Sequence, residues 1–113
     1  MYHVNTTRIA EQDLLDASIY IAQTLSNQVA ANRLLDKVAT ASVSLSQNPM
    51  RQPLVKDRYL AARGLRSLPV NNYLLFYVVR QKTNAVNIIR FIHSRRDWIN
   101  LFGEAIFENI TIE

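Results

Sequence analysis

The sequence of 113 residues contains no cysteine, no long apolar run and no low-complexity tract. Without cysteine the chain forms no disulfide and offers no thiolate, which is typical of proteins from a reducing cytoplasm. There is no run of eighteen apolar residues and no charged N-terminal segment followed by an apolar one, so we expect neither a membrane span nor a secretory signal. Asp57 and Asp97 are the only carboxylates in the basic middle of the chain. We therefore expect no metal and no cofactor.

The overall composition is that of a globular protein, with 49% hydrophobic and 19% charged residues. A chain of this length builds one hydrophobic core and leaves little room for a second. We find no internal repeat. Residues 1–113 are therefore expected to form a single domain.

The net charge of +4 is unevenly distributed along the chain. Residues 1–50 carry three basic and four acidic side chains, and residues 99–113 carry three glutamates. Residues 51–98 carry ten basic and two acidic side chains, which gives this stretch a net charge of +8. Such a density favours binding of a polyanion, either nucleic acid or an acidic protein segment. A solvated basic surface would have the same composition.

The first half of the sequence predicts a short strand followed by two amphipathic helices. Polar and apolar residues alternate over residues 2–7, as in a strand. From Thr7, whose hydroxyl can cap a helix, apolar residues recur every three or four positions as far as Leu25. Asn27 can cap a second helix that ends at Asn48–Pro49. The short link predicts an antiparallel helix hairpin, to which we assign a scaffold role and no chemistry.

The segment that follows the helices predicts a loop and then a strand. Residues 49–60 are polar and interrupted by prolines, as in a connecting loop. Residues 63–70 suit a strand that places Arg66 on one face and Arg63 on the other. Pro69 cannot donate to a strand ladder, so we expect it at an edge or a bulge.

Two apolar runs in the second half predict an antiparallel hairpin. Residues 73–79 are all large and apolar or aromatic, β-branched residues dominate 86–92, and residues 80–84 form a polar connection. Because alternate residues of a strand point to opposite sides, both faces of this hairpin are apolar. Two helices cover only one face of a sheet. We expect the other face to be covered by the C-terminal segment, a second copy or a partner chain.

A cluster of basic side chains follows the second strand of this hairpin, and we expect any function to lie there. Its members are Arg90, His93, Arg95 and Arg96. Arg90 and His93 are three positions apart, so they share a face only if the strand ends or bulges between them. Beyond the cluster, residues 99–107 predict a short helical segment. Residues 108–113 predict either a tail or one more strand.

The order of these elements resembles that of the RelE/ParE superfamily, toxins of type II toxin–antitoxin systems that include plasmid stabilisation proteins. The resemblance runs from about Val4 to Leu101, and the local sequences that carry it are AEQDLLDASIYIAQTLSNQVAANRLLDKV, RQPLV, GLRSLPVNNYLLFYVV and VNIIRFIHSRRDW. It implies an α+β fold in which an N-terminal helix hairpin packs on one face of an antiparallel β-sheet, with a short C-terminal helix. It also implies a cytoplasmic toxin neutralised by a cognate antitoxin, as a homo-oligomer or a toxin–antitoxin hetero-oligomer.

The resemblance leaves two activities open. RelE-like members cut messenger RNA on the ribosome without a metal, whereas ParE-like members poison DNA gyrase. Metal-free cleavage needs an acid, a base and a cation at the phosphate, for which His93 and Arg66 are the candidates. Contacts to nucleic acid or to a protein target are predicted for Arg63, Arg90, Arg95, Arg96, Tyr73 and Tyr77.

Departures from the nuclease pattern favour a poison. RelE-like nucleases carry an arginine directly after the tyrosine that opens the central strand, and Leu74 holds that place here. Their lysine pair in the preceding strand is also missing, with Ser67 beside Arg66. We therefore predict a ParE-like poison or an attenuated ribonuclease. A competent ribonuclease that uses His93 and Arg66 is the alternative, and a non-toxic binding module of the same fold is a third.

Overall fold

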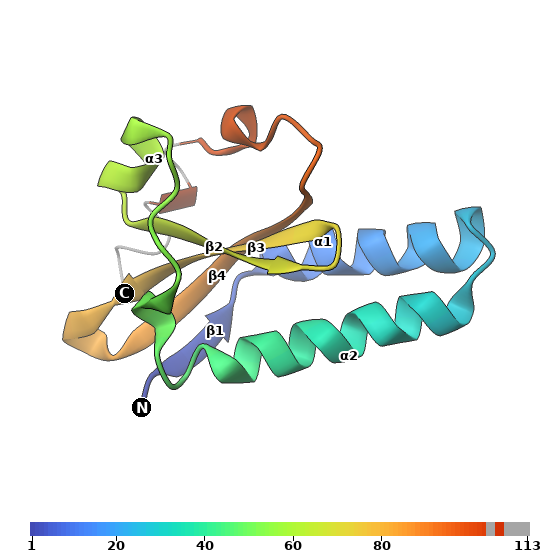
Figure 1. Cartoon of the computed structure of the whole chain (residues 1–113), viewed down its shortest axis with the longest axis horizontal. Helices are drawn as coiled ribbons and strands as arrows, with labels where there is room; N and C mark the ends of the chain where they lie inside the picture. The colour runs from blue at the N-terminus through green and yellow to red at the C-terminus, as the bar shows by residue number, and fades with distance from the viewer. Residues whose placement is uncertain (104–105, 108–113) are drawn as a thin grey trace.

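A helix hairpin covers one face of a four-stranded sheet in the computed structural model, which describes residues 1–103 and 106–107 (Figure 1). The strands are β1 (His3–Thr6), β2 (Leu65–Val70), β3 (Tyr73–Arg80) and β4 (Ala85–His93), in the sheet order β1-β4-β3-β2. The α-helices are α1 (Arg8–Ile19), α2 (Gln28–Ser44) and α3 (Arg58–Ala62). Short 3-10 turns occupy Pro49–Arg51, Gln81–Thr83 and Trp98–Leu101. The predicted α+β class is confirmed, and the predicted tail or strand 108–113 lies outside the described residues.

The sheet is mixed and not purely antiparallel as predicted, because β1 pairs parallel with β4 while the other strand pairs are antiparallel. A tight turn forces two strands to run antiparallel, and the chain between β1 and β4 contains the helix hairpin instead. Pro69 lies on the edge strand β2, as expected for a residue that cannot donate to a ladder. No helix in the described part of the chain is long and apolar enough to cross a bilayer.

The two long helices begin at the residues predicted to cap them. The Thr7 hydroxyl and the Asn27 side-chain carbonyl each accept a hydrogen bond from the backbone amide three residues further on. The first helix continues through a π-helical turn, Tyr20–Thr24. The second helix ends at Ser44, before the predicted Asn48–Pro49 stop. Caps act within one helical turn, which is why the sequence locates them well.

Helix α3 was not predicted, since residues 49–60 were expected to form a loop. Its N-terminus is capped by Asp57, whose carboxylate accepts a hydrogen bond from the backbone amide of Leu60 at 3.0 Å. The Leu60 side chain is buried, so this single helical turn contributes to the core. A five-residue helix is too short to show periodicity, but Asp57 is a residue type that favours the start of a helix and could have indicated it.

The sheet separates two hydrophobic clusters. The cluster on the helix side is centred on Leu34, Val38, Leu75, Tyr77, Ile88 and Phe91. The cluster on the opposite face contains Leu65, Phe76, Val78, Ile89 and Ile92, covered by Leu60, Phe102 and Phe107. Alternate residues of β3 therefore point to opposite faces, as predicted. The second face is covered by the C-terminal segment, one of the three covers expected, together with α3.

A β-bulge changes the register between β3 and β4. Phe76 pairs with Arg90 and Tyr77 pairs with Ile88, which leaves Ile89 as the extra residue. The bulge lies before Arg90, not between Arg90 and His93. By strand alternation those two side chains therefore leave opposite faces of the sheet.

Candidate functional site at the end of the central strands

Three rings meet where β3 begins and β4 ends. Tyr73 and His93 are direct partners across the two strands. The ring of Tyr73 stacks on that of Phe91, with centroids 4.8 Å apart and planes 8° from parallel. His93 meets Tyr73 edge-on, with centroids 5.2 Å apart and planes at 70°. Such packing fixes the orientation of the imidazole at the end of the sheet.

The turn after β4 orients His93 and exposes two arginines. The backbone amide of Arg95 donates a hydrogen bond to His93 Nδ1 at 3.2 Å, and the amide of Arg96 donates to the His93 carbonyl at 3.0 Å. Because Nδ1 is an acceptor, the neutral imidazole carries its proton on Nε2. The Arg95 and Arg96 side chains are exposed, and within the described residues neither forms an ion pair.

A cavity of about 410 Å³ lies beside these rings. We call this cavity and the exposed turn next to it the strand-end site. The residues that line the cavity are Asp13, Asp16, Ala17, Tyr20, Tyr73, Phe91, Ile92, His93 and Arg96. The lining therefore combines aromatic rings with both signs of charge. A purely anionic ligand would meet the Asp16 carboxylate as well as the Arg96 guanidinium.

Burial raises the pKa of Tyr73, and the nearby Tyr20 raises it further. Burial disfavours the phenolate because the charged form loses its hydration. The Tyr73 hydroxyl is therefore protonated at neutral pH. It can donate a hydrogen bond to a ligand but cannot act as a base.

Arg90 is held by a carboxylate of helix α1. Its Nε and Nη2 atoms lie 2.7 and 3.0 Å from the two oxygens of Asp13, and both side chains are only 14% exposed. Asp13 also accepts the backbone amide of Phe91 at 3.0 Å. This amide has no strand partner on the β1 side, because the pairing of β1 with β4 ends at Thr6 and Ile88. Arg90 is thus part of a structural pair, and we leave it out of the contact surface proposed below.

Arg66 and Tyr77 form a separate group near the edge strand β2, which we call the edge cluster. Tyr77 is completely buried, and its hydroxyl donates to the carbonyl of Pro49 at 2.5 Å. Arg66 donates to the carbonyl of Gln52. Burial raises the pKa of Tyr77, while Arg66 and Arg51 act weakly in the opposite direction. Tyr77 therefore offers no stacking face to a base, and we leave it out of the contact surface as well.

The structure does not bring Arg66 and His93 together. Arg66 pairs with Tyr77 on one side of β3, whereas His93 pairs with Tyr73 on its other side, four residues along the strand. Standard strand dimensions place their backbones roughly 16 Å apart. The guanidinium of Arg66 is also engaged with the segment that follows α2. The two residues predicted to act on one phosphate thus lie on opposite sides of β3, four residues apart along that strand.

Arg63 lies outside the strand-end site, at the C-terminal end of α3. Its guanidinium sits 5.4 Å from the ring centre of Tyr59 and 5.5 Å from that of Phe107. It also donates to the Tyr59 hydroxyl at 3.2 Å. The arginines predicted to contact a target are therefore not all gathered at the strand-end site.

The first helix and the π-helical turn after it were expected to be scaffold, yet they supply four residues of the strand-end cavity. Asp13, Asp16 and Ala17 come from α1, and Tyr20 comes from the turn. The spacing of three and four positions between Asp13, Asp16 and Tyr20 places them on one side of the helix, which the sequence alone could have indicated. The sequence could not indicate that this side of the helix meets the ends of β3 and β4. Among the described residues, no three histidine, aspartate or glutamate side chains are grouped so that they could hold a metal ion.

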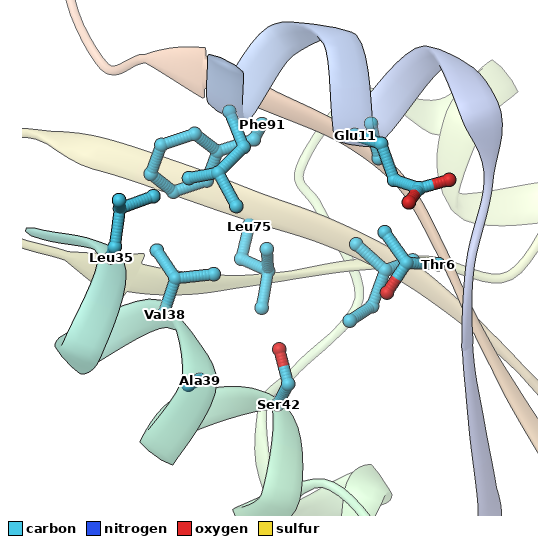
Figure 2. Close-up of a pocket in the computed structure, with 11 residues that line it drawn as sticks. Thr6, Glu11, Leu35, Val38, Ala39, Ser42, Leu75 and Phe91 are labelled. Carbon is cyan, nitrogen blue, oxygen red and sulfur yellow. The ribbon is translucent and has the colours of Figure 1, made fainter. Parts of the chain in front are cut away.

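A second cavity, of about 240 Å³, opens between α1, α2 and the sheet (Figure 2). Its walls are largely apolar, with Leu35, Val38, Leu75 and Phe91 side by side in Figure 2. Thr6, Glu11 and Ser42 supply its polar groups. The lining contains no cation, so this cavity suits an apolar side chain better than an anion.

The chain is similar to one toxin family and, in fold, to solved toxin–antitoxin structures. The family model of the ParE toxin of the type II toxin–antitoxin system parDE matches residues 4–98. The toxin–antitoxin complex RelBE2 from Mycobacterium tuberculosis is structurally similar, with a TM-score of 0.61 at 23% identity over 81% of this chain and 96% of that chain. The chromosomal ParDE system from P. aeruginosa gives a TM-score of 0.66 at 18% identity over 82% and 96%. No curated protein sequence matches the chain.

Proposed function

The chain belongs to the ParE toxin family of type II toxin–antitoxin systems, and we propose that this toxin binds and poisons DNA gyrase rather than cutting messenger RNA. The observation that carries the proposal is the separation of Arg66 from His93. Groups that act on one phosphate must lie within hydrogen-bond reach of it. Arg90 does not replace Arg66, because Asp13 holds its guanidinium.

The lining of the strand-end cavity supports a protein target. Asp16 and Arg96 line the same cavity as Tyr20 and Tyr73. Protein surfaces present both signs of charge together with apolar groups, whereas a nucleic-acid backbone presents only negative charge. We propose that Tyr73, His93, Arg95 and Arg96 contact the target. A gyrase target implies that the toxin acts in the cytoplasm.

We further propose that a cognate antitoxin neutralises the toxin through the apolar cavity between the helices. The two similar structures are toxin–antitoxin systems by name. In this chain the cavity shown in Figure 2 would take apolar side chains of a bound segment. An acidic segment would also be attracted by the net charge of +4.

One observation favours the ribonuclease alternative. His93 and Arg96 line the same cavity, and His93 Nε2 makes no hydrogen bond within the described residues, so a protonated His93 could donate from Nε2 to a leaving group. In that case Arg96, and not Arg66, would stabilise the phosphate. The test must therefore read out DNA and RNA in parallel.

The decisive experiment adds purified toxin to DNA gyrase with plasmid DNA and, separately, to translating ribosomes with a defined messenger RNA. We expect gyrase-linked DNA breaks and intact RNA. The double variant Arg95→Ala/Arg96→Ala should lose at least about tenfold in potency, since it removes two exposed cations from the target contact. Lys82→Ala is the matched control, because Lys82 is an exposed cation in the distant β3–β4 turn.

Two other results would overturn the proposal. Discrete ribosome-dependent RNA cuts that disappear in His93→Ala would establish the ribonuclease alternative. Normal growth after induction, with both assays negative, would establish the non-toxic binding module.

A further inference from the structure

The helix hairpin has a distal end that stands clear of the sheet. In Figure 1 the connection between α1 and α2 lies well beyond the end of the strands. Residues 17–32, which include this end and the helix turns that lead to it, contain no charged side chain. In a protein with a charge of +4, such a long uncharged stretch at an exposed end is unexpected for a purely solvated surface. We call residues 17–32 the hairpin tip.

Large apolar side chains of the hairpin tip face the solvent. Ile19 is 43% exposed, Leu25 is 55% exposed and Val29 is 60% exposed. Several exposed apolar groups on one protruding end are typical of an interaction surface. The backbone geometry is also irregular there. The first helix ends in the π-helical turn Tyr20–Thr24, and Ser26 adopts a left-handed conformation with φ of 49°.

One charge of each sign borders the hairpin tip. Asp16 precedes it on α1, and Arg33 follows it on α2. In the described residues the Arg33 side chain is exposed and makes no ion pair. The Asp16 carboxylate accepts a hydrogen bond from Gln12 at 2.8 Å. If two copies meet around a two-fold axis, Asp16 of each copy can pair with Arg33 of the other.

We infer that the hairpin tip is the docking surface for a second copy of this chain. Two hairpins that point toward each other and overlap over roughly 20 Å would place Asp16 of each copy beside Arg33 of the other, at a rise of about 1.5 Å per residue. The overlapping part is the uncharged residues 17–32. The basic segments 51–98 of the two copies then lie at opposite ends of the dimer, so their repulsion is small.

The size of this contact predicts a reversible dimer. Two helices about 10 Å wide that overlap over roughly 20 Å cover on the order of 400 Å² on each copy. The total of roughly 800 Å² is below the value of about 1,000 Å² that a stable specific interface buries. The dimer should therefore dissociate on dilution.

Sedimentation equilibrium of the full-length purified chain over a wide concentration range tests the inference. We expect the mass to rise from monomer to dimer. Leu25→Glu and Val29→Glu should each weaken dimerisation at least about tenfold, because each buries an unpaired charge at the contact. Val43→Glu is the control, since Val43 is 71% exposed on the same helix but lies at its opposite end. Circular dichroism would verify that each variant is folded.

A charge swap distinguishes a specific dimer contact from non-specific association. Asp16→Arg and Arg33→Asp should each weaken the dimer, whereas the double variant should restore it, because arginine then faces aspartate again. A chain that stays monomeric at all concentrations would overturn the inference. So would equal weakening by Val43→Glu, or losses that simply add in the double swap. Asp16 and Tyr20 also line the strand-end cavity, so the gyrase assay is compared on Leu25→Glu and Val29→Glu, whose positions lie outside that lining.

Discussion

The edge cluster, which meets the middle of β3, and the strand-end site at its start use their polar side chains in different ways. In the edge cluster, Arg66 and the Tyr77 hydroxyl are bound to main-chain carbonyls of the segment that follows α2. At the strand-end site, Arg95 and Arg96 are exposed and make no ion pair among the described residues. All four residues belong to the same basic stretch of the sequence. Counting cations therefore does not locate a binding surface, because the fold uses some of them to hold itself together.

Arg90 shows that the same distinction applies within a few residues of the strand-end site. Its guanidinium is paired with Asp13, while Arg95 and Arg96 follow in an exposed turn. The difference comes from the edge of β4, which is open after β1 ends and is closed by Asp13. The comparison predicts that anchoring residues control stability and exposed residues control target binding.

The largest effect on stability is expected for Asp13→Ala. This change removes the partner of a guanidinium that is only 14% exposed and leaves the Phe91 amide without its acceptor. Breaking a buried pair on one side costs about 3–5 kcal/mol. Denaturant unfolding should show such a loss, and Asp16→Ala, three residues along the same helix, should change little. Equal stability of the two variants would contradict the anchoring role of Asp13.

A smaller loss is expected for Tyr77→Phe. The change leaves the carbonyl of Pro49 without its donor inside the core, at a cost of about 1–3 kcal/mol. Tyr73→Phe is the matched variant at the other end of β3, and it should cost less because Tyr73 is only partly buried. If the Tyr73 variant were the less stable in denaturant unfolding, the anchoring role assigned to Tyr77 would be contradicted.

Replacing an arginine in the edge cluster should lower the stability of the fold, whereas replacing one at the strand-end site should not. Arg66→Ala removes the donor to the Gln52 carbonyl and should cost about 1 kcal/mol. Arg95→Ala should stay within about 0.5 kcal/mol of the parent, as is usual for exposed positions. Thermal unfolding measures both. A large destabilisation by Arg95→Ala would show that this side chain has a structural role.

The smallest effect concerns alkaline pH. The pKa values of Tyr73 and Tyr77 lie above the ordinary value of 10.0, mainly through burial. Above pH 10 the unfolded chain therefore loses these protons before the folded chain does, so stability is full below that pH and falls as pH rises. Tyrosinate absorbance should show two late-titrating groups. In Tyr77→Phe the alkaline fall in stability should become shallower, and an unchanged slope would contradict the assignment.

The sequence alone determined the features that depend on neighbouring residues. Thr7 and Asn27 cap helices within one turn, and alternation along β3 assigned Phe76 and Leu75 to opposite faces. These interactions join residues at most four positions apart, or follow from the pleat of a single strand. The sequence also showed the resemblance to a toxin family, since that resemblance rests on the order of such elements.

Only the tertiary structure decided which polar residues are available. Arg90 and Asp13 are 77 positions apart in sequence, and Tyr77 and Pro49 are 28 apart. Nothing in either local sequence reveals that these residues meet. The parallel pairing of β1 with β4 likewise follows from a long connection that no turn motif constrains. Local patterns fix faces and caps, whereas the partner of a charged side chain is set by chain segments that meet only after folding.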